Sequence, residues 1–260
     1  MNNFMVFLHK EFMEMWRDKR AVILAAVFVF FGVLSPVMMR YMNELFALLM
    51  SEEELAMMGI GAMEIPHWTA SYVGFFGNLN QVGMIALILL AMGVIVSEKR
   101  RGTAALMMVK GLGHKSFVLS KFAVWSINTF VVLLVAIAVN HALTIILWGE
   151  GAQLGNLISG FLMYWVFAMM MIALVILTST IAKSLAISAV FGFLGFMLLS
   201  IPASLPRIQD AFPYTLSFRA SDMVASGYFP TMAWANIATA ILTTALFLGI
   251  SIAVLRKKEL

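Results

Sequence analysis

Residues 111–116, Gly-Leu-Gly-His-Lys-Ser, contain the residue types with which proteins bind nucleotide phosphates. A phosphate-binding loop has the pattern G-x-x-x-x-G-K-[ST] after a strand, because its backbone amides must surround the phosphate groups. The two glycines of that pattern would stand at positions 109 and 114, where this chain has Val109 and His114. The sequence therefore excludes ATP binding through this motif, and we expect the chain itself to bind no cofactor.

Other residue patterns that carry chemistry are also missing from the sequence. The chain has no cysteine, which excludes disulfides, thiol catalysis and cysteine metal sites. It contains no HExxH metal pair and no G-x-S-x-G serine motif. His9 and His114 are expected on one side of a membrane and His67 on the other, so they cannot join His141 in a metal site. We therefore expect neither an enzyme nor a metal-binding protein.

The composition places the chain among membrane proteins. Of its 260 residues, 62% are apolar and 12% charged, and the mean hydropathy is +0.97, whereas soluble domains carry about 25% charged residues. A transmembrane helix needs about 20 apolar residues. The stretches that qualify are 21–39, 72–96, 122–148, 157–182, 185–201 and 232–255. We expect an all-α integral membrane protein with six transmembrane helices, because such continuous runs do not fit the alternating strands of a barrel.

The basic residues predict the orientation of these six helices. The N-terminal segment, the 97–121 connection, Lys183 and the C-terminal tail together carry 14 of the 17 Lys and Arg residues. Cytoplasmic loops are enriched in Lys and Arg, so both termini are predicted to be cytoplasmic and the protein to lie in the plasma (inner) membrane. The net charge of +4 needs no nucleic-acid partner, because positive cytoplasmic loops account for it.

The segment 1–20 is predicted to be an amphipathic helix on the membrane surface. On a helical wheel one arc carries Phe4, Met5, Leu8, Phe12, Met15 and Trp16. The opposite side carries Lys10, Glu11, Glu14, Arg17 and Asp18, with Phe7 as the exception. Such a helix would either anchor the chain to lipid or also contact a cytoplasmic partner through its charged face.

The 97–121 connection is predicted to form a helical hairpin. Residues 103–110 favour a helix, and Gly111 and Gly113 interrupt it before the third span begins. The charge of this loop alone would fit contacts with lipid headgroups. On the opposite side, residues 40–71 are acidic and partly helical by composition. Residues 202–231 contain four prolines and are expected to form short interfacial or re-entrant helices.

The hairpin residues resemble a known family. Glu98, Gly102, Thr103, Leu106 and Lys121 match a pattern of the type-2 ABC transporter permeases: an acid, a Gly-Thr pair, an apolar helix and a lysine entering the next span. The opening LHKEFMEMWRDKR resembles the amphipathic elbow helix of that family. The six-span layout and the interrupted outer segment before the last span also match, so the resemblance covers nearly all of residues 1–260 as a single permease domain.

The resemblance implies an exporter subunit with two kinds of protein partner. One is a second copy of this permease or a related one, and the other is a pair of cytoplasmic ABC ATPase subunits that bind ATP and Mg²⁺. The ATPase would contact the elbow helix and the hairpin, with the turn at Lys183 as a smaller contact. The expected coupling residues are Lys10, Glu11, Glu14, Arg17, Glu98, Arg101, Gly102, Thr103, Lys121 and Lys183. Gly102 would bend the chain and Thr103 would cap the following helix.

Polar residues within the spans are candidates for a translocation path. Asn78 and Gln81 are three residues apart in the second span and are expected to share a face. Asn140 and His141 lie in the outer half of the third span. We expect the four residues to line the translocation path and Asn78, Gln81 and Asn140 to face a shared cavity, while interhelical hydrogen bonding is the alternative.

Two other functions fit the sequence. One is an ion-coupled secondary transporter, although no Asp, Glu, Lys or Arg stands near the centre of a predicted span to carry a proton or an ion. The other is a membrane scaffold that holds an ATPase without transporting anything.

Overall fold

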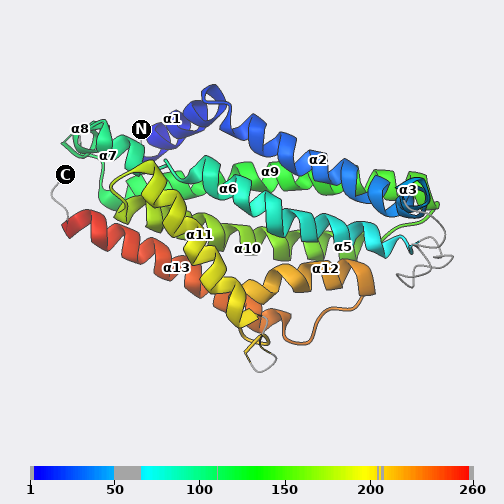
Figure 1. Cartoon of the computed structure of the whole chain (residues 1–260). Helices are drawn as coiled ribbons and strands as arrows, with labels where there is room; N and C mark the ends of the chain where they lie inside the picture. The colour runs from blue at the N-terminus through cyan, green and yellow to red at the C-terminus, as the bar shows by residue number, and fades with distance from the viewer. Residues whose placement is uncertain (1–2, 50–65, 110, 204, 206–207, 258–260) are drawn as a thin grey trace.

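The computed structural model describes residues 3–49, 66–109, 111–203, 205 and 208–257. These residues form helices and connecting turns, with no strand in the described ranges (Figure 1). Six helices are long and apolar enough to cross a membrane, which confirms the expected all-α architecture. They are α2 (Arg20–Arg40), the interrupted helix Thr69–Arg100, α9 (His114–Trp148), α10 (Leu154–Ile181), α11 (Leu185–Ala203) and α13 (Ala233–Lys257).

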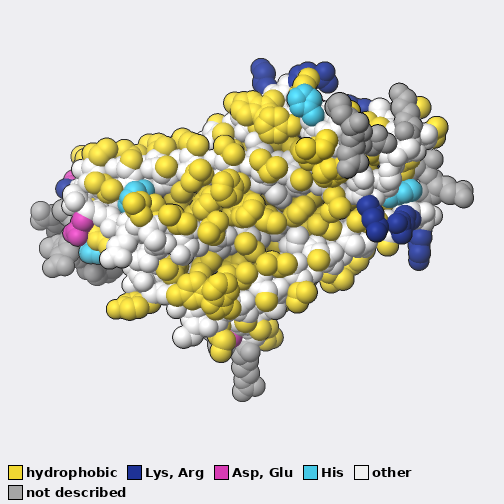
Figure 2. Space-filling model, turned by 180° about the vertical axis from the view of Figure 1, so that it is seen from behind, with side chains coloured by type: hydrophobic (Ala, Val, Ile, Leu, Met, Phe, Trp, Pro, Cys, Tyr) yellow, Lys and Arg dark blue, Asp and Glu magenta, His cyan; other side chains and the backbone are white. Residues whose placement is uncertain are grey.

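Helix α10 is the centre of the bundle. Its most apolar stretch is 72% buried, compared with 17% for α11 and 22% for α13. The aromatic rings of Tyr164 and Phe167 are fully buried in α10 and lie 5.6 Å apart. The outer helices therefore keep wide apolar surfaces, and Figure 2 shows hydrophobic side chains across the middle of one face. Contact of such an apolar surface with lipid is favourable and its contact with water is unfavourable, as expected for a multi-pass membrane protein.

The second span is interrupted in two places. It consists of α5 (Thr69–Asn78), the π-helical turn η1 (Leu79–Gly83) and α6 (Met84–Ala91), and after a turn it continues as α7 (Val96–Arg100). A π-helical turn holds one extra residue, so it changes which side chains share a face before and after it. The interruption after Ala91 separates the apolar part of the span from the charged helix α7.

Short helices occupy part of the outer connections, as expected. Helix α3 (Met42–Leu49) follows α2, while residues 50–65 of the predicted acidic segment lie outside the described residues. Before the last span, η2 (Pro213–Thr215) and α12 (Leu216–Ser226) pack against the bundle. Gly160 of α10 permits this packing, since a Cβ there would come within 2.7 Å of the Ala220 carbonyl oxygen.

The basic end of the molecule carries α1 (Asn3–Arg17), α7, α8 (Thr103–Val109) and the end of α13 (Figure 1). Lys19 adopts a left-handed conformation with φ of 59°, and the chain turns there from α1 into α2. Helix α1 packs against α9. The hairpin formed by α7 and α8 ends at Gly111, whose φ of 87° turns the chain toward α9. The predicted hairpin is therefore present, with α8 ending at Val109.

Candidate functional site: a buried charge cluster

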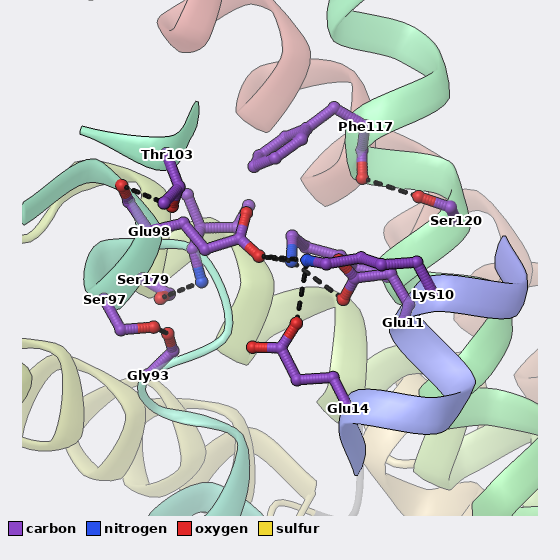
Figure 3. A network of polar contacts seen from close by, with 12 residues as sticks. Lys10, Glu11, Glu14, Gly93, Ser97, Glu98, Thr103, Phe117, Ser120 and Ser179 are labelled. Carbon is purple, nitrogen blue, oxygen red and sulfur yellow. Dashed lines mark hydrogen bonds and ion pairs between the residues drawn. The ribbon is translucent and has the colours of Figure 1, made fainter. Parts of the chain in front are cut away.

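Five charged side chains from three segments meet at the basic end. We call them the charge cluster: Lys10, Glu11 and Glu14 of α1, Glu98 of α7 and Lys121 of α9. The Lys121 ammonium lies 2.8 Å from Glu11 Oε2 and 3.0 Å from Glu98 Oε1. The Lys10 ammonium lies 3.0 Å from the same Glu98 oxygen, 2.9 Å from Glu11 Oε1 and 2.7 Å from Glu14 Oε2 (Figure 3). The cluster therefore joins α1, the hairpin and α9.

Helix α1 directs Lys10 and Glu11 toward α7 and α9, contacts within the chain that sequence analysis did not predict. Phe7, Glu11 and Met15 are spaced four residues apart and form the buried stripe against the bundle. Met5, Phe12 and Trp16 are instead exposed on the outside. The apolar arc is thus available to lipid. Phe7, which the helical wheel placed on the charged side, lies on the side of α1 that packs against the bundle.

Three members of the charge cluster are almost completely removed from solvent. Lys121 is 2% exposed, Glu98 5% and Glu11 8%. The cost of burying an unpaired charge is high, and the two carboxylates beside Lys121 offset that cost. The rings of Phe7 and Phe117 add to this environment, with centroids 5.7 and 5.0 Å from the Lys121 ammonium. One lysine thereby fixes contacts with two other segments.

The two partly exposed members of the cluster have shifted pKa values. Burial lowers the pKa of Lys10, but hydrogen bonds to Glu14 and Glu11 and the nearby carboxylates outweigh burial and raise that pKa above 10.5. Burial raises the pKa of Glu14, but its hydrogen bond to Lys10 and the attraction of Lys10 and Lys121 bring that pKa below 4.5. Both side chains therefore carry their charges at neutral pH.

Three carboxylates and two ammonium groups leave the cluster with an excess of one negative charge. The Oε2 atom of Glu98 is buried and has no hydrogen-bond partner among the residues that the structure describes. A cavity of ≈ 20 Å³ beside it is lined by Glu14, Ser97 and Lys121, among others, which is enough space for one water molecule. Carboxylate oxygens of Glu11, Glu14 and Glu98 lie within 4.8 Å of one another. The two lysine ammonium groups bind oxygens of all three carboxylates, so the arrangement is an ion-pair network.

Backbone contacts fix the start of the hairpin against α10. The Ser179 hydroxyl accepts hydrogen bonds from the backbone N–H groups of Ile95 and Val96, both at 3.0 Å. The same hydroxyl donates to the Met92 carbonyl at 2.9 Å. The first N–H groups of a helix have no partner within it, so Ser179 caps α7 from a neighbouring helix. Sequence analysis did not identify this serine, because its role depends on tertiary contact.

The hairpin itself is shaped by Gly102, Thr103 and Lys99. Gly102 has a φ of 72°, as its expected role in bending the chain requires. Thr103 does not cap α8 in the way expected. It is the first residue of α8, and its hydroxyl donates to the Glu98 carbonyl at 3.2 Å, which ties α8 to α7. Lys99, which sequence analysis did not select, donates to the carbonyls of Thr180 and Ala182 at the end of α10.

The remaining predicted coupling residues lie at the surface. Arg17, Arg101 and Lys183 are exposed, and they do not join the charge cluster. Lys183 follows Ala182, whose carbonyl accepts the Lys99 hydrogen bond, so the turn at Lys183 is connected to the hairpin through the backbone. The predicted set therefore divides into a buried group that joins the segments and an exposed basic group.

The four predicted path residues lie in different surroundings. Asn140 is fully buried, 3.5 Å from the Ser71 hydroxyl and the Gly32 carbonyl. His141 Nδ1 is 2.6 Å from the Tyr72 hydroxyl. Asn78 donates to the Ser35 hydroxyl at 3.1 Å. Gln81 is exposed and lines a pocket next to α12.

Asn78 and Gln81, which were expected to share a face, have different neighbours. Asn78 contacts Ser35 of α2, whereas Gln81 lies within the π-helical turn η1 and lines the pocket beside α12. The three buried or half-buried residues are engaged in contacts between helices in this single chain. Their role in a translocation path stays a prediction.

Comparison with known proteins gives one weak similarity. No family model matches the chain. The uncharacterized transmembrane protein YxlG of Bacillus subtilis (strain 168) is 24% identical over 123 residues, which are 47% of this chain and 46% of that protein. The chain therefore spans about half the length of the curated relative it matches. This similarity and the six apolar helices agree on a multi-pass membrane protein.

Proposed function

We propose that this chain is the membrane-spanning subunit of an ATP-driven ABC exporter and transmits movement from a separate cytoplasmic ATPase to its spans. In this proposal the protein lies in the plasma (inner) membrane with both termini in the cytoplasm. It pairs with a second permease copy or a relative, and the ATPase pair binds ATP and Mg²⁺. The resemblance of the 97–121 hairpin and the elbow helix to type-2 permeases motivates the proposal.

The charge cluster is the observation that carries this proposal. Glu98 of the hairpin shares one carboxylate oxygen between Lys10 of α1 and Lys121 of α9, each at 3.0 Å. The hairpin is further held to the end of α10 through Ser179 and Lys99. A displacement applied to the hairpin would therefore move α1, α9 and α10, because the buried contacts leave no slack to absorb it.

The exposed part of the hairpin has the composition of a protein-binding surface. Leu106 is 62% exposed and Val109 87% exposed on α8, next to the exposed side chains of Arg100 and Arg101. Exposed apolar surface marks sites where a protein contacts a partner or a membrane, and arginine is enriched where proteins bind one another. The exposed members of the predicted coupling set would contact the ATPase, and the buried members would pass the movement on.

The test measures complex formation, ATP hydrolysis and movement on the same sample. The chain is purified from its native membrane with bound proteins, and spin labels are attached at Tyr41→Cys and Gln153→Cys. Both positions are exposed at the ends of spans, and the chain has no cysteine of its own. We expect a soluble ATPase to purify with it and Mg-ATP to change the distance between the labels.

The variant Glu98→Gln keeps the shape of the hairpin side chain but removes its charge. We expect it to retain the ATPase and its hydrolysis while the distance change falls. The matched control, Glu44→Gln, changes an exposed acid on α3 and should behave as the wild type. A distance change driven by an ion gradient without any ATPase would favour a secondary transporter. A complex that hydrolyses ATP without moving the labels would favour a scaffold.

A further inference from the structure

A polar pocket of ≈ 290 Å³ lies on the side of the molecule where α12 packs against the second span. Figure 1 shows α12 and α5 running side by side at the end opposite the hairpin. The pocket is lined by Val73, Phe76, Asn80, Gln81, Phe218 and Asp222, together with Gly77, Ser217 and Ser221. Ligand pockets usually combine apolar walls with a few polar groups, and this one has both.

The π-helical turn gives the pocket its amide groups. Asn80 and Gln81 both belong to η1, and turns of this kind occur frequently at functional sites. Asn80 is held in place, since its amide nitrogen donates to Ser217 at 3.3 Å and its oxygen accepts from Tyr214 at 3.5 Å. Within the described part of the chain, Gln81 has no such contact and is exposed to the pocket. One amide thus fixes the wall, and the other remains available to a ligand.

Asp222 supplies an unpaired negative charge. The nearest arginine along α12, Arg219, is bound to Asp210 at 3.0 Å. Across the described ranges Asp222 forms no ion pair. Burial raises the pKa of Asp222 above 3.8, while the charge of Arg219 opposes this shift. A carboxylate beside an apolar wall interacts more strongly with a cation than one in bulk water does.

The aromatic wall completes a site suited to a cation that carries apolar groups. Phe76 is buried in the wall, and Phe218 is 46% exposed. Aromatic faces attract ammonium groups, and quaternary ammonium ligands are commonly held this way. Val73, 50% exposed on α5, offers an apolar contact. An anion would meet Asp222, so the lining also selects against negatively charged ligands.

We propose that this pocket binds the ammonium group of an amphiphile, with Asp222 opposite the cation, Gln81 as hydrogen-bond partner and Phe218 against the apolar part. If the proposed export function holds, the occupant is a transported cationic amphiphile, and this part of the inference rests on that function. A membrane lipid with an ammonium headgroup has the same chemistry. The binding site itself does not depend on the ATPase.

Binding is measured on the purified chain in dodecyl maltoside, with radiolabelled dodecylammonium, a primary ammonium that can donate hydrogen bonds, as probe in a scintillation proximity assay. We expect saturable binding that dodecanol, the uncharged analogue, does not displace. Asp222→Asn should weaken binding about tenfold, because it replaces a charge-assisted hydrogen bond to the ammonium with a weaker neutral one. Gln81→Leu should weaken binding by a smaller factor. The matched control Glu150→Gln changes an exposed acid outside the pocket and should bind as the wild type.

Size-exclusion profiles identify any variant that fails to fold. If Asp222→Asn does not fold, Gln81→Leu tests the proposal in its place. Equal binding by Asp222→Asn and the wild type, or an equal loss in Glu150→Gln, would overturn the proposal. Displacement of the probe by phosphatidylethanolamine would identify a lipid headgroup as an occupant, and its failure to displace would point to a transported amphiphile. The assay contains no ATPase, so the pocket can bind the probe even if the exporter proposal fails. The exporter proposal can likewise hold even if the pocket does not bind the probe.

Discussion

Lys121 shows how a single residue can decide whether a membrane protein folds correctly. It stands one position before the predicted start of the third span, yet it is 2% exposed and lies inside α9. Its ammonium is bound by carboxylates from two other segments. Removing it would leave Glu11 without one partner in a buried site and would take one of two ammonium groups from Glu98.

We therefore expect Lys121→Met to destabilise the protein by about 3–5 kcal/mol, the usual cost of breaking a buried ion pair. The unfolding midpoint in detergent measures this effect. The matched control, Lys115→Met, removes an exposed lysine from the same helix and should change the midpoint little. The double variant Lys121→Met with Glu11→Gln should lose less stability than the two single changes added together. Equal midpoints for the 121 and 115 variants would contradict the structural role.

The sequence singled out all five members of the charge cluster, but it did not indicate that they meet. The helical wheel separated apolar from charged residues on α1, and it gave no reason to place the charged side against the protein. Only the spacing of Phe7, Glu11 and Met15 could have shown that a carboxylate lies in the packed stripe. The pairing of Glu98 with Lys121 depends on how α7 is oriented, which is set by contacts with α10.

At the scale of elements, the interruptions of the second span matter most. The sequence predicted one continuous span over 72–96, because the stretch is largely apolar and contains no Asp, Glu, Lys or Arg. The structure divides it at η1 and after Ala91. Neither interruption has a proline to reveal it. The hairpin was predictable because Gly102 and Gly111 stand where positive φ values are required.

Ser179 is expected to hold the second interruption in place. Ser179→Ala would leave the N–H groups of Ile95 and Val96 buried without partners, at a cost of about 1–3 kcal/mol for each. We expect faster hydrogen exchange in α7 and α8 than in the wild type. Ser159→Ala is the matched control, since Ser159 lies on the same helix, is partly exposed and donates to the Gly155 carbonyl of its own helix. Unchanged exchange in α7 would show that Ser179 does not hold the hairpin.

The whole molecule separates its charges along its length. The apolar surface extends across the middle in Figure 2, with Lys and Arg side chains beyond it. This arrangement is what the distribution of basic residues predicted. Composition was enough to predict the apolar middle and the charged ends, because every span must present apolar side chains to the membrane. The inward packing of α12 beside α10 was less predictable, since it depends on the close approach at Gly160.

The orientation in the membrane is predicted from the basic residues and can be measured directly. Single cysteines at Lys115 and Gln153 lie at opposite ends of the bundle, and both positions are exposed. We expect an impermeant thiol reagent to label position 153 in intact cells and position 115 only after the cells are opened. Labelling of position 115 alone in intact cells would reverse the orientation and remove the basis for an ATPase beneath the hairpin.

Lys10 and Lys121 form ion pairs with carboxylates of the same chain, and this has a consequence for how the chain is made. Charges that orient a membrane protein act while its segments are being inserted, before distant segments have met. Lys121 therefore acts at two times: first as a positive charge that keeps the 97–121 connection on one side, and later as a buried partner of Glu11 and Glu98. Replacing Glu11 should leave insertion untouched and affect only the assembled protein. The acidic members of the cluster thus contribute to assembly alone, while its lysines also contribute to biosynthesis.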